Sequence, residues 1–281
     1  MTSLPTLRYA AFVLSLALAD LGWGASGPAL IVHDGTPGIE ADVIGNLSAK
    51  LTAAGYTVTE NVGIPGGSLA ANKQIWDVRF NNTTPLTGGD ITAYVTYLAG
   101  GGSLFVMGEN TGFATRNASI VSLIQTAGGG TITVVTPANA QTVQAPFTGP
   151  TALATITYAA AAGTAATGTL SFITKDASNI GAAILYGPGA LSSAPAGSLL
   201  IVFDVNFLQA GADANSQALS NNMIQYLAAP IFVPPSAAPQ AQSAPTLSEW
   251  GMILLACGLF FVAFRRLGLR RAPHATASGS G

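Results

Sequence analysis

The sequence predicts an α/β fold: a doubly wound, mostly parallel sheet with a β-rich extension, followed by a single C-terminal transmembrane helix. Short apolar runs alternate with segments of helical periodicity in the first half of the chain. A threonine- and glycine-rich stretch follows, and a strand and a helix close the domain. Repeated β-α units of this kind favour parallel strands joined by right-handed crossovers.

Strands and helices alternate as far as residue 126. Strands are predicted at 29–33, 56–60, 75–80 and 104–107, and helices at 38–54, 90–98 and 119–126. In the first helix Ile39, Val43, Leu47 and Leu51 recur at a four-residue spacing, and Gly55 ends the helix. This half of the chain therefore supplies the parallel part of the sheet.

The pattern changes after three consecutive glycines at 128–130. Residues 131–190 are predicted to form the β-rich extension, with threonine-rich strands at 131–135, 155–158, 167–173 and 182–186. The α/β pattern then returns, with a buried strand at 198–203 and a closing helix at 214–227.

The region between the two ends of the chain is mildly acidic. Ten acidic residues stand against five basic ones, which are Lys50, Lys73, Arg79, Arg116 and Lys175. Nucleic-acid binding needs a basic surface, so a nucleic-acid partner is not expected. The single cysteine, Cys257, lies beyond this region, which therefore has no disulfide and no cysteine for catalysis or zinc. We expect no metal and no cofactor.

Residues 1–26 have the features of a signal peptide. Arg8 supplies a positive charge, residues 9–18 are apolar, and small residues at 17–19 and 24–26 offer two cleavage sites. The predicted exported domain is 27–233, and a proline-rich linker at 234–245 follows it.

The C-terminal region is predicted to cross a membrane. The 15 residues at 250–264 carry no charge, and Arg265, Arg266, Arg270 and Arg271 follow them. This run is short against the roughly 20 residues of a typical transmembrane helix, but snorkelling arginines extend its reach. The positive-inside rule places the arginines in the cytoplasm and the domain outside.

The segment Pro245-Thr-Leu-Ser-Glu-Trp-Gly251, with the apolar run and arginines after it, resembles the IPTL-CTERM sorting tail. The motif of that family reads I-P-T-L-x-x-W-G, and this chain has Ala244 where the family prefers Ile or Val. The resemblance implies processing at the inner membrane by an exosortase-type enzyme and transfer to the periplasm or cell surface. The sorting residues would be Pro245, Thr246, Leu247, Trp250, Gly251, Arg265 and Arg266. Residues 246–271 would hold the sorting motif, the transmembrane helix and the basic end, and 272–281 would be a disordered tail.

Two further segments, 97–110 and 197–208, resemble the class I glutamine-amidotransferase-like superfamily in its trehalose-utilisation-like branches. The resemblance implies a flavodoxin-like sheet with a cysteine nucleophile at the turn after the strand at 104–107. Here Gly108 is followed by Glu109, and His33 is the only histidine of the exported domain. A Cys-His-Glu glutaminase triad is therefore excluded.

Polar residues follow three predicted strands at the edge where doubly wound sheets bind ligands. They are His33 with Asp34, Glu109 with Asn110, and Asp204 with Asn206. Three interpretations stay open. In the first, these side chains cap helices and turns. In the second, Asp34, Asn110 and Asn206 bind a small ligand, or Glu109 and Asp204 bind a cation together with Asp34. In the third, Glu109 acts in catalysis with Asp204 or His33.

Three functions follow from these interpretations. The first is an exported, non-catalytic surface protein that binds extracellular polysaccharide or other surface proteins. The alternative is a secreted or tethered carbohydrate-active hydrolase. In the third, the protein is periplasmic and its membrane tail is never removed.

Overall fold

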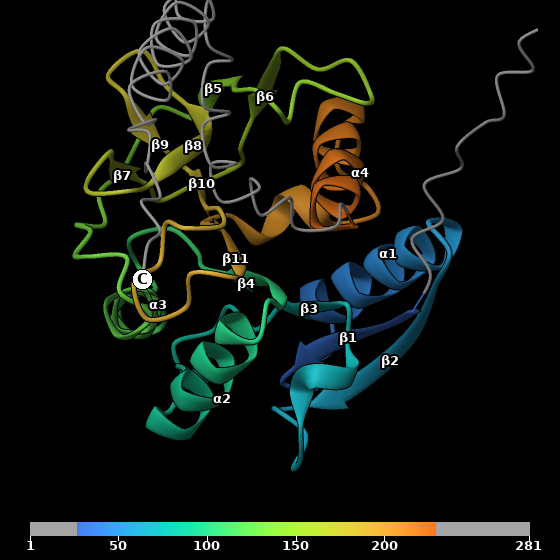
Figure 1. Ribbon diagram of the computed structural model, residues 1–281. Coiled ribbons are helices and arrows are strands. Elements are labelled where there is room, and N and C mark those ends of the chain that lie inside the picture. Colours follow the sequence, from blue (N-terminus) through green and yellow to red (C-terminus); the bar gives the residue numbers. More distant parts are fainter. Residues whose placement is uncertain (1–26, 229–281) are drawn as a thin grey trace, which may run out of the picture. The chain divides into compact units, whose positions relative to one another are not determined.

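The computed structural model describes residues 27–228, which fold around a nine-stranded sheet (Figure 1). The strand order is β2-β1-β3-β4-β11-β10-β8-β5-β6. The first five strands are parallel and the remainder are antiparallel to their neighbours. A mixed α/β fold with a large central sheet is thereby confirmed, and the parallel strands have the order 2-1-3-4-5 of a doubly wound sheet.

The parallel strands come from both ends of the described chain. They are β1 (Gly27–His33), β2 (Tyr56–Val62), β3 (Gln74–Asp77), β4 (Ser103–Met107) and β11 (Ser198–Val202). β11 pairs with β4 in register from Ser198 opposite Ser103 to Val202 opposite Met107. The whole antiparallel extension is therefore inserted in sequence between two strands that are neighbours in the sheet.

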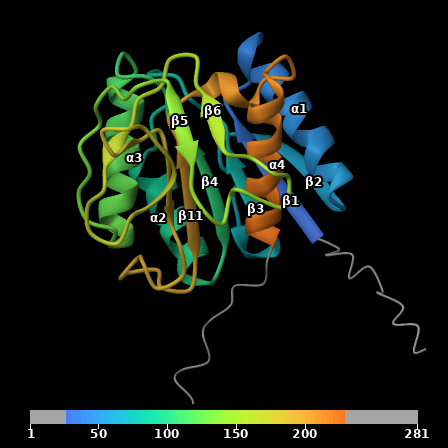
Figure 2. The same ribbon diagram turned by 90° about the horizontal axis from the view of Figure 1, so that it is seen from above.

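Four α-helices cover the two faces of the sheet (Figure 2). α1 (Ile39–Ala53) and α4 (Ala214–Ala228) pack on the face that carries Trp76 and Phe105. α2 (Gly88–Ala99) and α3 (Ala114–Ala127) pack on the opposite face, against residues such as Val106. Both faces of β1, β3, β4 and β11 are buried, as the continuous apolar runs in these strands require.

The antiparallel part consists of short strands and an additional small sheet. The strands are β5 (Ala140–Val143), β6 (Thr155–Thr157), β8 (Ser171–Lys175) and β10 (Ala183–Tyr186), and β7 (Thr164–Ala165) pairs separately with β9 (Ile180–Gly181). There are two short 3₁₀ helices: η1 (Leu69–Ala71) precedes β3, and η2 (Val205–Leu208) follows β11.

Several predicted elements need correction. Residues 131–135 form no strand: Val135 makes one bridge to Gly163, while Ile132 packs into the core on the α2 and α3 face. β5 was not predicted, and the strand expected at 167–173 begins only at Ser171. The strand expected at 75–80 ends at Asp77, because the Asp77 carboxylate accepts a hydrogen bond from the Arg79 backbone N–H and turns the chain.

The helix expected at 119–126 begins at Ala114, because Asn82 caps it from another loop. The Asn82 side-chain oxygen accepts from the backbone N–H groups of Thr115 at 3.0 Å and Arg116 at 3.3 Å. These are donors that the first turn of a helix leaves unused.

Within residues 27–228, no helix has both the length and the apolarity needed to cross a membrane. The predicted signal peptide at 1–26, the linker at 234–245, the transmembrane run at 250–264 and the tail at 272–281 lie outside the described residues. They remain predictions, as do the bounds of the exported domain.

Candidate functional site

The carboxyl ends of β1, β3, β4 and β11 lie at one edge of the sheet, and a polar residue follows or ends each strand. These residues are Asp34, Asp77, Glu109 and Asp204. The sequence predicted three of these four positions and missed Asp77. In a sheet of this strand order, the carboxyl edge is where ligands bind.

After β1, a buried carboxyl group organises the loop that leads into α1. Glu40 is 1% exposed and its two side-chain oxygens accept from the backbone N–H groups of Asp34 and Thr36, both at 2.9 Å. Burial and the hydrogen bond with the Asp34 carboxyl group raise the pKa of Glu40 to about 7. Glu40 is not among the residues predicted from the sequence, because it has the pattern of an ordinary acidic residue in the first turn of a helix.

Asp34 lies on the outer side of this loop. Its carboxylate accepts from the Thr36 N–H at 2.8 Å and from the Thr84 hydroxyl at 3.3 Å. Burial alone would raise the pKa of Asp34, but hydrogen bonds from Glu40, Thr36 and Thr84 together lower it. His33, the other candidate here, accepts from the Gly35 N–H through Nδ1 at 3.1 Å. Both side chains therefore stabilise the turn after β1.

The raised pKa of Glu40 predicts that the domain loses stability as pH rises. The folded-state pKa is about 7 against an ordinary value of 4.5, so the protonated form favours the folded state. Its contribution should be complete below about pH 4.5 and lost through about pH 7, a change on the order of 2 kcal/mol once solvent screening is included. Urea unfolding at a series of pH values measures it. The Glu40→Gln variant should show a flatter profile between these pH values, and an unchanged profile would contradict the prediction.

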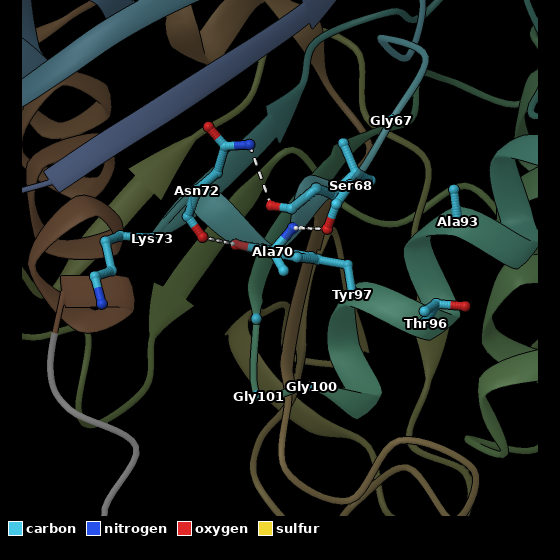
Figure 3. A pocket seen from close by; sticks show the side chains of 12 residues that line it. Gly67, Ser68, Ala70, Asn72, Lys73, Ala93, Thr96, Tyr97, Gly100 and Gly101 are labelled. Carbon is cyan, nitrogen blue, oxygen red and sulfur yellow. Dashed lines mark hydrogen bonds between the residues drawn. The ribbon is translucent and has the colours of Figure 1, made fainter.

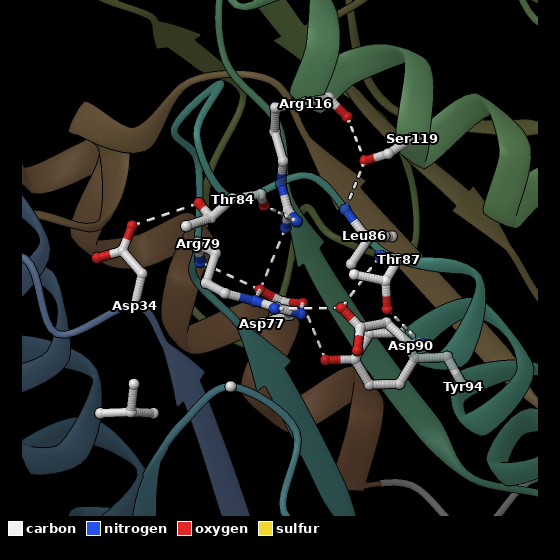
Figure 4. A network of polar contacts seen from close by, with 12 residues as sticks. Asp34, Asp77, Arg79, Thr84, Leu86, Thr87, Asp90, Tyr94, Arg116 and Ser119 are labelled. Carbon is white, nitrogen blue, oxygen red and sulfur yellow. Dashed lines mark hydrogen bonds and ion pairs between the residues drawn. The ribbon is translucent and has the colours of Figure 1, made fainter.

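A buried ionic network follows β3 (Figure 4). Asp77 and Arg116 are both 0% exposed, and an Arg116 N–H donates to the Asp77 carboxylate at 3.1 Å. Arg79 binds the same carboxylate through two N–H groups, at 3.0 Å and 2.6 Å, and Tyr94 donates its hydroxyl at 2.9 Å. Burial would raise the pKa of Asp77, but the Arg116 and Arg79 charges hold it below its usual range.

Arg116 also joins this network to two backbone segments. Its Nε donates to the Met107 carbonyl at 3.0 Å, and another N–H donates to the Thr84 carbonyl at 3.2 Å. One side chain thereby connects α3, the end of β4 and the loop before α2. The Asp77 carboxylate and the Met107 and Thr84 carbonyls all receive hydrogen bonds from side chains of the network. The cluster therefore has a structural role.

Glu109 and Asp204, the predicted catalytic candidates, are bound by backbone amides. Glu109 is 3% exposed, and its two oxygens accept from the Val205 N–H at 2.8 Å and from the Asn110 N–H at 2.8 Å. Asp204 is 0% exposed and accepts from Ala159, Ala160 and Asn206, with the shortest contact, to Ala159, at 2.7 Å.

Burial raises the pKa of both carboxyl groups, and the charge of Asp204 raises the pKa of Glu109 further. Together they join the end of β4 to the end of β11 and fix the chain after β6. The geometry is that of turn and helix caps, the first of the three interpretations.

The two asparagine candidates differ in their surroundings. The Asn110 side chain donates to Glu109 and accepts from the Gly112 N–H, so it closes a turn. The Asn206 side chain donates to Gln209 and lines a pocket of about 530 Å³ at the carboxyl edge. Of the predicted ligand-binding residues, Asn206 is the one that lines this pocket.

A second pocket, of about 330 Å³, lies at the opposite edge of the sheet (Figure 3). The loop 67–73 and the C-terminal end of α2 form its walls. The Ser68 hydroxyl accepts from the Ala70 N–H, and the Asn72 amide donates to the Leu69 carbonyl. These polar groups are used within the loop itself. Among residues 27–228, no group of three or more His, Cys, Asp or Glu side chains is placed to hold a metal ion.

Comparison with known proteins gives one sequence match and several structural ones. Residues 242–271 match the IPTL-CTERM motif. This match indicates an exported, membrane-associated surface protein. No curated protein sequence matches the chain.

Two solved structures show the fold. The mmIFT52 N-terminal domain has 14% sequence identity and a TM-score of 0.55, covering 71% of this chain and 97% of that domain. A ThuA-like protein from Bacteroides uniformis has 10% identity and a TM-score of 0.51, covering 72% of this chain and 91% of its own. The ThuA-like neighbour supports the trehalose-utilisation-like fold predicted from the sequence.

Proposed function

We propose that the chain is a bacterial cell-surface protein processed at its C-terminal tail by an exosortase-type enzyme, with a non-catalytic, amidotransferase-like binding domain at 27–233. Its route would be a single-pass inner-membrane intermediate with a cytoplasmic C-terminus, followed by the periplasm or cell surface. The match of residues 242–271 to the IPTL-CTERM motif carries this proposal. Extracellular polysaccharides or other surface proteins would be the binding partners.

The strand-end carboxyl groups support a non-catalytic role. Glu109 and Asp204 are 3% and 0% exposed, and their oxygens accept from backbone N–H groups, so they fix the chain and are not presented to a substrate. The turn after β4 also lacks a strained nucleophile position. Among the described residues, Asn179 is the only non-glycine residue with a positive φ.

The hydrolase alternative predicted from the sequence has a direct test. Hydrolysis of a polysaccharide by the wild-type protein, lost in a Glu109→Gln variant of equal stability, would establish catalysis in place of the binding role. Absence of turnover in the wild-type protein on substrates that it binds would support the proposal.

The sorting tail gives the main test of the proposal. In a host that carries an exosortase-type enzyme, the surface form of the wild-type protein should lack the arginines at 265–271, because the tail is cut near the motif. Replacing Pro245, Thr246 and Leu247 together with alanine should leave most molecules uncut and held in the membrane fraction. Intact-mass spectrometry of the surface and membrane fractions measures both results.

The matched control is Pro239→Ala, which changes a linker proline outside the motif and should leave processing unchanged. A mature wild-type protein that still contains Arg271 would contradict the proposal and favour the tethered periplasmic form.

A further inference from the structure

The pocket of about 530 Å³ at the carboxyl edge lies between α1, η2, α4 and the segment after β6. Asp42, Asn206, Gln209, Asp213 and Ser216 are polar residues of its lining. Its volume falls within the range of small-molecule sites in proteins, about 300 to 1,000 Å³. Of these residues, only Asn206 is a binding candidate predicted from the sequence.

Two carboxylates line the pocket, and in each of them only one oxygen accepts a hydrogen bond from the protein. One Asp42 oxygen accepts from the Ala210 N–H at 3.1 Å, and one Asp213 oxygen accepts from the Ser216 N–H at 2.7 Å. Among the described residues, the second oxygen of each carboxylate has no hydrogen-bond donor. Both residues are exposed, so these oxygens can meet a ligand.

No lysine or arginine lines the pocket to balance these charges. Lys50, on the same helix as Asp42, donates instead to the Gln217 carbonyl and to the Asn221 side chain. The pocket therefore favours a ligand that carries positive charge over an anion.

Ser216 provides an independent observation. The residue is 4% exposed and lines the pocket, yet its hydroxyl has no hydrogen-bond partner among residues 27–228. The Ser216 hydroxyl is not one of the fully buried oxygens of the described residues, so it reaches the space of the pocket, where a ligand can meet it. Asn206 and Gln209 add amide groups on the adjoining wall. A hydroxyl with two amides suits a ligand with several hydroxyl groups, which both donate and accept.

We propose that this pocket binds an amino-sugar unit, a polyhydroxylated ring with a free ammonium group, as found in deacetylated hexosamine polysaccharides. Asp42 and Asp213 receive the ammonium and neighbouring hydroxyls, and Ser216, Asn206 and Gln209 bind the remaining hydroxyls. This inference rests on the binding role proposed above and is independent of how the tail is processed.

The test is calorimetric titration of the full chain, purified in detergent micelles, with the disaccharide of glucosamine. The N-acetylated disaccharide and cellobiose, which lack the ammonium, are the comparison ligands. The glucosamine disaccharide should bind measurably and at least roughly fivefold more tightly than either, as expected when one charge contact near a protein surface is lost. Equal affinity for the three sugars, or no binding of any, would overturn the proposal.

Asp213→Asn is the principal variant, because asparagine keeps an oxygen for the Ser216 N–H and caps helices as well as aspartate does. It should weaken binding of the glucosamine disaccharide roughly fivefold and weaken cellobiose binding less, because cellobiose has no ammonium group whose charge contact could be lost. Glu60→Gln is the matched control, since it removes one exposed carboxylate from β2, which does not line the pocket. Equal weakening by both variants would show a general charge effect and overturn the proposal.

Ser216→Ala is a second variant and should weaken binding of all three sugars. Circular dichroism melting curves verify that each variant is folded. Because tail processing is measured in cells and sugar binding on purified protein, failure of one test is distinguishable from failure of the other.

Discussion

Replacing Arg116 with methionine should lower the free energy of unfolding by about 3 to 5 kcal/mol, the cost of breaking a buried ion pair by removing one partner. Arg116 and Asp77 are both 0% exposed. The substitution leaves the Asp77 carboxylate with only Arg79 and Tyr94, and it leaves the Met107 and Thr84 carbonyls without this donor. Urea unfolding followed by circular dichroism measures the loss.

The double variant Asp77→Asn/Arg116→Met is the control for this mechanism. Removing the carboxylate charge as well should recover part of the lost stability, because the cluster is then neutral again and Arg79 keeps its ion pair with Asp90. A loss below about 1 kcal/mol in the single variant would contradict the prediction, since that is the range of exposed ion pairs.

Replacing Asp204 with alanine should have the second-largest effect, a loss of about 3 kcal/mol or more. Three backbone N–H groups, of Ala159, Ala160 and Asn206, would lose their charged acceptor, and the buried position of the Asp204 side chain would be left empty. Thermal and urea unfolding measure the change. The Ala159 segment also lines the carboxyl-edge pocket, so sugar binding should weaken along with stability.

The Asp204→Asn variant separates the effect of losing some of these hydrogen bonds from the effect of losing the whole side chain. Asparagine keeps one acceptor oxygen and turns an NH₂ group towards the donors on the other side, so its stability should fall between wild type and Asp204→Ala. Unchanged stability in Asp204→Ala would contradict a structural role. It would return Asp204 to the group of candidate functional residues.

The sequence predicted the parallel half of the fold well, because its strands are buried on both faces and its helices carry local periodicity. The run of apolar residues at 104–107 and the four-residue spacing of Val43, Leu47 and Leu51 are both local signals. The extension was predicted less well. Its threonine-rich segments all have strand propensity, and which of them pair depends on neighbours distant in sequence.

The sequence predicted only those site residues that directly follow a predicted strand. Strand ends identified Asp34, Glu109 and Asp204, but no local pattern links Asp77 to Arg116, which are 39 residues apart. Glu40 was missed for a related reason. The loop folds back onto it through Gly35 and Gly38, whose φ angles of 82° and 93° cannot be read from the sequence. The pocket residues, from α1, η2 and α4, converge only in three dimensions.

The position of β11 sets an order in which the sheet can assemble. β1, β2, β3 and β4 follow one another within 27–107 and can pair early, over short chain separations. β4 gains its other neighbour only when residues 198–202 arrive, and α4 follows them. A chain interrupted before residue 198 thus has an open β4 edge and an incompletely covered apolar face, features that promote aggregation. Chaperone capture and proteolysis should therefore act mainly on chains that end within the antiparallel extension.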